Sequence, residues 1–156
     1  MNVILIVILI IFAMNIIKTY SFLASKPQII DQINRYQSEI TDASQKTGVA
    51  ENIIKAIIYV ESAGNPYAVS DVNAVGLMQV TNIAVQQLGY SYPAQIPALN
   101  ILQGTEYFKW CLNHTSDLYE ALRAYNCGLT KSKSNNSCGS SYANNVISKI
   151  PYFSND

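Results

Sequence analysis

Apolar residues recur every three or four positions along most of this chain, and this periodicity constrains its fold more than any other feature. Such spacing is typical of amphipathic helices, whereas strands need alternation of apolar and polar residues, which the sequence does not sustain. There is also no internal repeat. The sequence therefore predicts a mainly α fold, with helical stripes at residues 25–48, 50–61, 83–88, 100–112, 118–125 and 142–150.

Composition narrows the class of protein further. The 156 residues are 49% hydrophobic and only 13% charged, which indicates one globular domain rather than a disordered chain. Ten basic residues balance ten acidic ones, and no basic run is long enough to follow a phosphate backbone, so nucleic acid is not an expected partner. Eleven tyrosines suit sugar or peptide surfaces, although many of them would fit a core equally well.

The N-terminus carries an unbroken apolar run from Val3 to Met14, continued by Ile16 and Ile17 and closed by Lys18. It falls just short of the ~18 apolar residues typical of a spanning helix. We therefore expect residues 1–24 to be a signal peptide or a membrane anchor, more in keeping with an uncleaved segment because no clean cleavage site follows. The alternative is a buried N-terminal helix of a cytoplasmic protein.

The three cysteines leave two interpretations open. Cys127 and Cys138 bracket a segment rich in Gly, Ser and Asn that one disulfide could close, which would suit an oxidising periplasm and leave Cys111 as a buried thiol. Alternatively, Cys111, His114 and the other two cysteines supply the ligand types of a zinc site, at a spacing unlike the usual knuckle. Connectivity cannot be read from the sequence.

Glu61 is the position most suggestive of chemistry. It follows Ile57 by four residues and Ile53 by eight, so a helix places its carboxyl on the apolar stripe. Burial disfavours the charged form and should raise the pKa of this carboxyl toward the range of a general acid at neutral pH. The alternative is a glutamate at a helix end that bonds to a loop backbone.

Five short motifs follow one another around and after this residue: IYVESAGNP at 58–66, AVGLMQV at 74–80, NILQGTEYF at 100–108, AYNCG at 124–128 and YANNV at 142–146. Together they resemble the lytic transglycosylase family with the goose-type lysozyme-like fold, over residues 40–150. The resemblance implies a compact lysozyme-like helical domain at residues 25–156, preceded by the hydrophobic segment.

The resemblance assigns roles to residues on three of these motifs. Glu61 matches the single catalytic glutamate, and Ser62 matches the serine that helps to hold its carboxyl. Tyr125 and Asn126 match the pair that flanks the catalytic cleft, although Tyr125 could also be a core residue. Tyr142 matches the tyrosine whose hydroxyl points toward the catalytic carboxyl.

The motif at 74–80 matches the loop that lines the glycan groove. Gly76 and Leu77 both belong to this loop, and Gly76, which has no side chain, would let the backbone approach the sugar. Met78 would pack against a sugar ring, with core packing as its alternative, and Gln79 would hydrogen-bond an N-acetyl or hydroxyl group. Tyr107 is interpreted as structural.

The expected mechanism uses one carboxyl twice. Ordinary glycosidases need two carboxylates, but the nearby Asp71 lies in a turn-rich loop and matches no catalytic position. The resemblance implies that Glu61 protonates the oxygen between N-acetylmuramic acid and N-acetylglucosamine and then acts as base on the C6 hydroxyl, which closes a 1,6-anhydro ring. No metal or cofactor is expected. The alternatives are a hydrolytic muramidase and a non-catalytic peptidoglycan-binding assembly protein.

The surroundings of the motifs suggest a specialised context. The Lys/Ser/Asn-rich segment at residues 129–139 departs from the family pattern, and the chain leaves no room for a separate wall-binding domain. We therefore expect an enzyme tethered to the membrane that opens the wall locally for a secretion, conjugation or phage-entry apparatus. Its location would be the bacterial periplasm, exported or anchored in the inner membrane, with a phage virion as the alternative; Lys18 and Lys26 alone would favour the cytoplasm.

Overall fold

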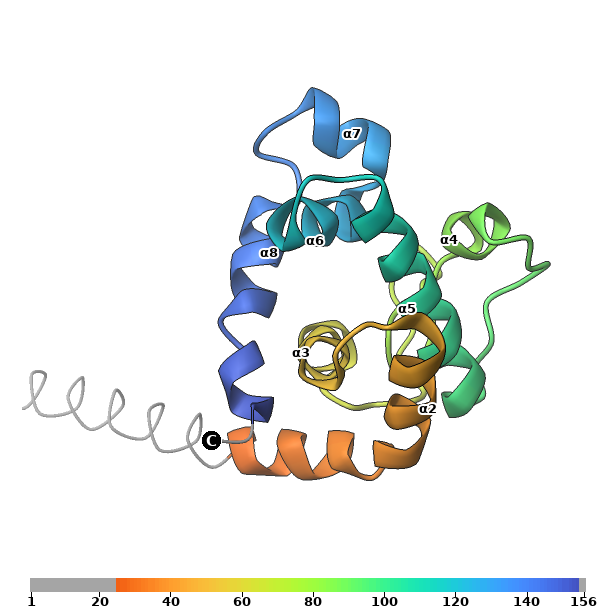
Figure 1. The fold of residues 1–156 in the computed structure, drawn as a ribbon. Coiled ribbons are helices and arrows are strands. Elements are labelled where there is room, and N and C mark those ends of the chain that lie inside the picture. The colour runs from red at the N-terminus through yellow and green to blue at the C-terminus, as the bar shows by residue number, and fades with distance from the viewer. Residues whose placement is uncertain (1–24, 155–156) are drawn as a thin grey trace, which may run out of the picture.

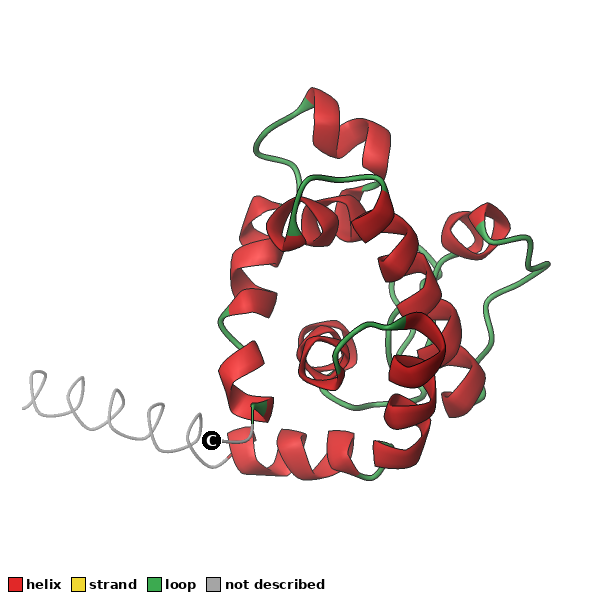
Figure 2. Ribbon diagram, viewed as in Figure 1, coloured by secondary structure: helices red, strands yellow, loops and turns green. Residues whose placement is uncertain are grey.

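The computed structural model describes residues 25–154, and the predicted signal peptide or anchor at residues 1–24 lies outside them. Within the described residues the backbone forms helices, loops and two isolated β-bridges, Val69 with Val75 and Val75 with Val80 (Figure 2). None of the helices described is both long and apolar enough to cross a membrane. The prediction of a mainly α fold is confirmed.

A first helical stretch covers residues 25–34 and is followed by seven named α-helices and one 3-10 helix. Their bounds are α2 Gln37–Thr47, α3 Glu51–Ser62, α4 Asn82–Gln87, α5 Pro97–Asn113, α6 Leu118–Cys127, α7 Leu129–Ser134, α8 Ser140–Ile147 and η1 Ile150–Phe153.

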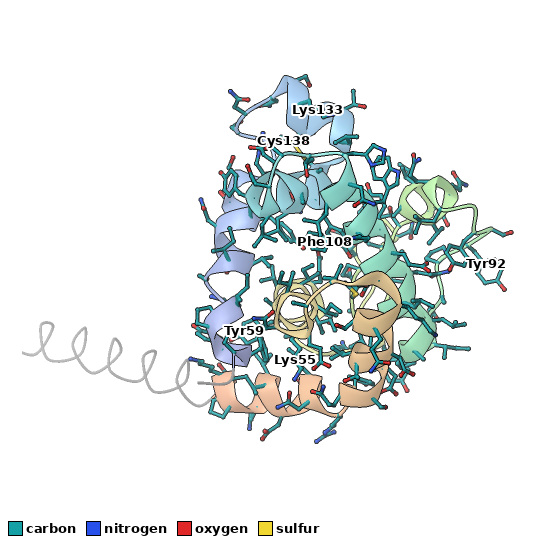
Figure 3. The ribbon with its side chains drawn as sticks, viewed as in Figure 1. Lys55, Tyr59, Tyr92, Phe108, Lys133 and Cys138 are labelled. Atoms are coloured by element: carbon teal, nitrogen blue, oxygen red, sulfur yellow. A yellow bond between two sulfur atoms is a disulfide. The ribbon has the colours of Figure 1, made fainter. Side chains whose placement is uncertain are left out.

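Helix α3 lies at the centre of the domain, seen end-on in Figure 1. Helices α2 and α8 and the 3-10 helix η1 pack directly against it. The first helical stretch, α5 and α6 complete the ring around it in Figure 1. Its apolar stripe supplies Ile54, Ile57 and Ile58, none of which is exposed to solvent. Phe108 of α5 points into the same core (Figure 3). The last turn of α3, which carries Glu61, is thereby fixed by the packing of the whole domain.

The predicted helix at 25–48 is in fact two helices, separated by a turn at residues 35–36. The amide of Tyr36 donates to the carbonyl of Ile33, and helix α2 begins at the next residue. Ile33 and Ile40, on opposite sides of the turn, are both fully buried. The change of direction lets each helix bury its own apolar face, whereas a straight helix would carry one of these faces away from the core.

The sequence predicts no helix between residues 125 and 142, but α7 lies there, because buried Arg123 holds this segment in place. The Arg123 guanidinium donates to the carbonyls of Ser132 (2.9 Å), Asn135 (2.6 Å) and Cys138 (2.9 Å). It also pairs with Glu120 at 2.7 Å. The polar composition of this segment gave no sign of a helix, because the residue that holds it, Arg123, belongs to α6.

Cys127 and Cys138 form a disulfide that closes the same segment, with their Cα atoms 6.2 Å apart. Cys111 is a buried free thiol. His114 is exposed and its Nδ1 lies 2.7 Å from the carbonyl of Trp110. Nowhere in residues 25–154 do three His, Cys, Asp or Glu side chains gather as metal ligands would, so the zinc alternative does not fit this arrangement.

Gly104 marks a close approach between α5 and the loop that precedes α4. A Cβ added there would lie 2.6 Å from the Cβ and 2.7 Å from the Sδ of Met78, which is itself fully buried. Alanine is the better helix former by about 1 kcal/mol, but overpacking a tight core costs about 1–3 kcal/mol.

We therefore predict that Gly104→Ala lowers the free energy of unfolding by up to about 2 kcal/mol, measured by urea denaturation. Gln45→Ala, at an exposed position inside α2, is the control and should change it by less than about 0.5 kcal/mol. A stabilised Gly104→Ala protein would show that helix propensity outweighs this contact.

Candidate active site

Glu61 lies in the last turn of α3, where the chain leaves the helix through Ala63 in a left-handed conformation (φ 52°). Its carboxyl lines a pocket of about 230 Å³. Burial raises the pKa of this carboxyl to about 7, and the hydrogen bond from Tyr142 opposes part of that rise. The expectation of an inward-facing acid with a raised pKa agrees with this geometry.

Two tyrosines from different helices support this carboxyl. The Tyr142 hydroxyl, on α8, donates to Oε1 of Glu61 at 2.7 Å. The Tyr125 hydroxyl, on α6, donates to the carbonyl of Met78 at 2.7 Å, and its ring stacks on Tyr142 with centroids 6.4 Å apart. Burial, followed by the charge of Glu61, raises the pKa of both phenols well above their usual range. Both hydroxyls therefore remain donors at neutral pH.

The loop at 74–80 forms one wall of the pocket and is held from two sides. Ser62 Oγ donates to the carbonyl of Leu77 at 2.8 Å, which ties the loop to the end of α3. From α5, buried Asn100 accepts from the amide of Met78 at 2.9 Å and donates to the carbonyl of Val75 at 2.9 Å. Gly76 (φ 77°) allows this approach, since a Cβ there would lie 2.5 Å from Asn100 Nδ2.

Of the nine predicted site residues, four line the pocket: Glu61, Gln79, Tyr125 and Asn126. Tyr142 reaches the pocket through its bond to Glu61. The other four, Ser62, Gly76, Leu77 and Met78, support the pocket from behind. The remaining lining residues are Ser70, Val72, Ala74, Val80, Thr81, Ala84 and Tyr107.

Several predicted roles need correction. Leu77 and Met78 have no solvent exposure, so Met78 cannot pack against a sugar ring; it packs against α5 at Gly104. The hydrogen bonds of Ser62 go to backbone groups rather than to the Glu61 carboxyl, so Ser62 holds the loop.

Gln79 and Gly76 also make contacts within the protein that were not predicted. Gln79 Nε2 donates to the carbonyls of Ala68 and Gly76, both at 3.0 Å, which leaves its Oε1 as the group available to a ligand. Gly76 is buried and meets Asn100 instead of lining the pocket.

Asn100 and Tyr107 are the residues that the sequence interpretation undervalued. Asn100 lies on the apolar stripe of its helix, four residues before Gly104 and eight before Phe108, and a polar residue at such a position needs partners. That signal was present in the sequence. Tyr107, interpreted as structural, is indeed buried but also lines the pocket, where its neighbours come from distant helices.

Glu61 is the only acidic side chain among the described residues that line the pocket. Asp71 is exposed in the turn that joins the bridge partners Val69 and Val75, and it is not part of the lining. The arrangement therefore offers one carboxyl that is able to exchange a proton near neutral pH, in a pocket walled by aromatic, amide and hydroxyl side chains.

Comparison with known proteins identifies the family of this chain. The family model described as the transglycosylase SLT domain matches residues 38–147. The chain therefore belongs to this family, and the matched region contains Glu61, Gln79, Tyr125 and Tyr142.

Curated relatives and solved structures agree with this membership. The chain is 40% identical over 60 residues to membrane-bound lytic murein transglycosylase E of Buchnera aphidicola, covering 38% of this chain and 27% of the relative. It is 36% identical over 113 residues to membrane-bound lytic murein transglycosylase C of Klebsiella pneumoniae, covering 61% and 31%. The chain thus spans less than a third of the length of these relatives.

Two crystal structures share the fold. An inactive mutant of the lytic transglycosylase Slt from Pseudomonas aeruginosa aligns with a TM-score of 0.62 at 20% identity, covering 74% of this chain and 23% of that one. The 70 kDa soluble lytic transglycosylase of Escherichia coli aligns with a TM-score of 0.57 at 24% identity, covering 76% and 21%. At these identities the likeness establishes the lysozyme-like fold alone.

The raised pKa of Glu61 makes stability depend on pH in a defined direction. Between pH 4.5 and about 7 the unfolded chain releases this proton while the folded chain keeps it, so wild-type stability falls as the pH rises. Glu61→Gln removes this penalty. We predict that the free energy of unfolding of Glu61→Gln, relative to that of the wild type, is about 1–3 kcal/mol more favourable at pH 8 than at pH 5.

Urea denaturation of the two proteins at both pH values checks this prediction. Asp42→Asn, which removes a carboxyl from an exposed position on α2, serves as the surface control. A difference between Glu61→Gln and wild type that is equal at the two pH values would contradict the raised pKa.

Proposed function

We propose that this chain is a peptidoglycan lytic transglycosylase in which Glu61 is the catalytic acid and base. The observation that carries the proposal is the single half-buried carboxyl, with a pKa near 7, that Tyr142 holds in a pocket free of other acids among the described residues. Membership of the SLT domain family and the names of the curated relatives support it.

The proposed reaction uses the neutral form of Glu61 first. Its proton goes to the oxygen that leaves C1 of N-acetylmuramic acid, and the bond from C1 to N-acetylglucosamine breaks. The N-acetyl oxygen of the substrate supports the positive charge at C1. The resulting Glu61 carboxylate then removes the proton of the C6 hydroxyl, whose oxygen bonds to C1 and closes the 1,6-anhydro ring. No water is consumed, and Glu61 ends protonated as it began.

Tyr142 assists both halves of this cycle. Its hydroxyl stabilises the carboxylate that forms after the first proton transfer, while burial keeps the carboxyl protonated before it. A pKa near 7 leaves Glu61 able to act as acid and as base without a large penalty in either direction. Gln79 Oε1 and the exposed amide of Asn126 are proposed to contact the glycan.

The same site could support two other functions. A muramidase would let water attack C1, and a non-catalytic assembly protein would bind the strand without cleaving it. The second alternative gives no reason for a carboxyl held protonated near neutral pH, which is costly to bury if it never reacts.

The proposed location and organisation follow from the substrate. We assign residues 25–156 to the catalytic domain and residues 1–24 to a signal peptide or membrane anchor, in a bacterial periplasm where the wall is accessible. The relatives named above are bacterial proteins described as membrane-bound, which supports a membrane-associated location. A role in opening the wall for a secretion or conjugation apparatus is the narrower proposal.

Mass spectrometry of the soluble products distinguishes these functions. The full chain is incubated with purified peptidoglycan beside Glu61→Gln, which keeps the shape of the side chain. We predict muropeptides that end in 1,6-anhydro-N-acetylmuramic acid, lighter by one water than hydrolytic products, and a loss of rate of about 10²–10⁴-fold in the variant.

Three outcomes would contradict the proposal. Reducing-end products would make the chain a muramidase. An absence of products from folded protein would favour the non-catalytic binding alternative. Unchanged cleavage by Glu61→Gln would exclude Glu61 as the catalytic acid.

A further inference from the structure

A second pocket, of about 300 Å³, adjoins the Glu61 pocket. The two share Tyr107, and their walls continue along neighbouring positions, from Ala84 to Ile83 at α4 and from Asn126 to Cys127 on α6. A strand bound at Glu61 would therefore pass beside it. The second pocket, which we call the α4–α7 pocket, is lined by Ile83, Gln87, Tyr107, Trp110, Cys127, Gly128, Leu129, Thr130 and Lys131.

The chemistry of the α4–α7 pocket differs from that of the Glu61 pocket. Tyr107 and Trp110 stack almost parallel, with centroids 5.8 Å apart and planes 8° from one another. Ile83 is 78% exposed and presents an apolar side chain to anything that enters this pocket. Among the described residues that line this pocket, Lys131 is the only charged one. Apolar and aromatic walls with one cation suit a ligand that is partly apolar and carries a carboxylate.

Among the described residues, no side chain competes for the Lys131 ammonium group. Within residues 25–154 the only salt bridge joins Arg123 to Glu120, and no hydrogen bond involves the Lys131 side chain. The backbone that carries Lys131 is nonetheless well held. Helix α7 begins next to the Cys127–Cys138 disulfide, and Arg123 donates to the carbonyls of Ser132 in α7 and of Asn135 directly after it. Figure 1 shows α7 packed beyond α6, and Lys133 is labelled on it in Figure 3.

We propose that the α4–α7 pocket binds the stem peptide of the glycan strand whose sugar is cleaved at Glu61, with Lys131 pairing to a peptide carboxylate. This inference rests on the proposed function. Stem peptides carry free carboxylates and aliphatic side chains, which complement the ammonium group and the apolar wall formed by Ile83 and Leu129. The sugars of the strand offer no such carboxylate while the peptide is attached.

The test compares two variants of α7 on two forms of peptidoglycan. Lys131→Gln removes the proposed contact, and Lys133→Gln removes an exposed charge on the same short helix that does not line the pocket. One substrate is native peptidoglycan, and the other has its free carboxyl groups converted to amides with carbodiimide and ammonia. Both variants are made in the full chain, and kcat/KM is measured for each substrate.

We expect Lys131→Gln to lower kcat/KM on native peptidoglycan about three- to tenfold, and Lys133→Gln to leave it unchanged. Amidation should cost the wild type the same factor and cost Lys131→Gln nothing further. An equal loss by Lys131→Gln on both substrates would assign the pocket to a sugar and overturn the proposal. No loss on either would overturn it as well.

A binding measurement separates this proposal from the proposed function. The full chain with Glu61→Gln is titrated with a soluble stem tetrapeptide by NMR, with and without Lys131→Gln. Binding that Lys131→Gln abolishes and Lys133→Gln retains would support the peptide pocket even if the chain released no anhydro products. Absence of binding, or binding that is unaffected by Lys131→Gln, would overturn the pocket and leave the assignment of Glu61 untouched.

Discussion

The partial burial of one carboxyl at the end of the central helix is the constraint on which the rest of this structure depends. Glu61 is held in place by the packing of α3, whose isoleucines are fully buried, so its position does not rely on a mobile loop. Burial raises its pKa to about 7, and the Tyr142 hydroxyl compensates in part for the lost solvent. An acid set in a rigid core is the chemical basis of the proposed reaction.

The surrounding helices contribute to the fold and to the site with the same side chains. Asn100 satisfies the backbone of the 74–80 loop and thereby shapes the pocket wall. Tyr125 holds the carbonyl of Met78 and presents its ring to Tyr142 and to the pocket. Substitutions at these positions would be expected to lower stability and activity together, whereas Glu61→Gln should lower activity without lowering stability.

The sequence predicted most of the helices and the central position of Glu61, because both follow from local periodicity. The sequence-based prediction was wrong where contacts between distant segments determine the local structure. The turn at residues 35–36 reflects two faces that must both be buried, and α7 exists because Arg123 reaches its carbonyls from another helix. Met78 was expected at the groove, but its contact with Gly104 could not be read from spacing within one segment.

The central claim is that Glu61 is a carboxyl that titrates near neutral pH with Tyr142 as its donor. The most direct measurement is an NMR titration of the Glu61 side-chain carboxyl, with ¹³C-labelled glutamate, in the wild type and in Tyr142→Phe. The account predicts a pKa of about 7 in the wild type, and a higher one in Tyr142→Phe because a bond that favours the carboxylate is lost. A pKa near 4.5 in the wild type, or a lower one in the variant, would contradict it.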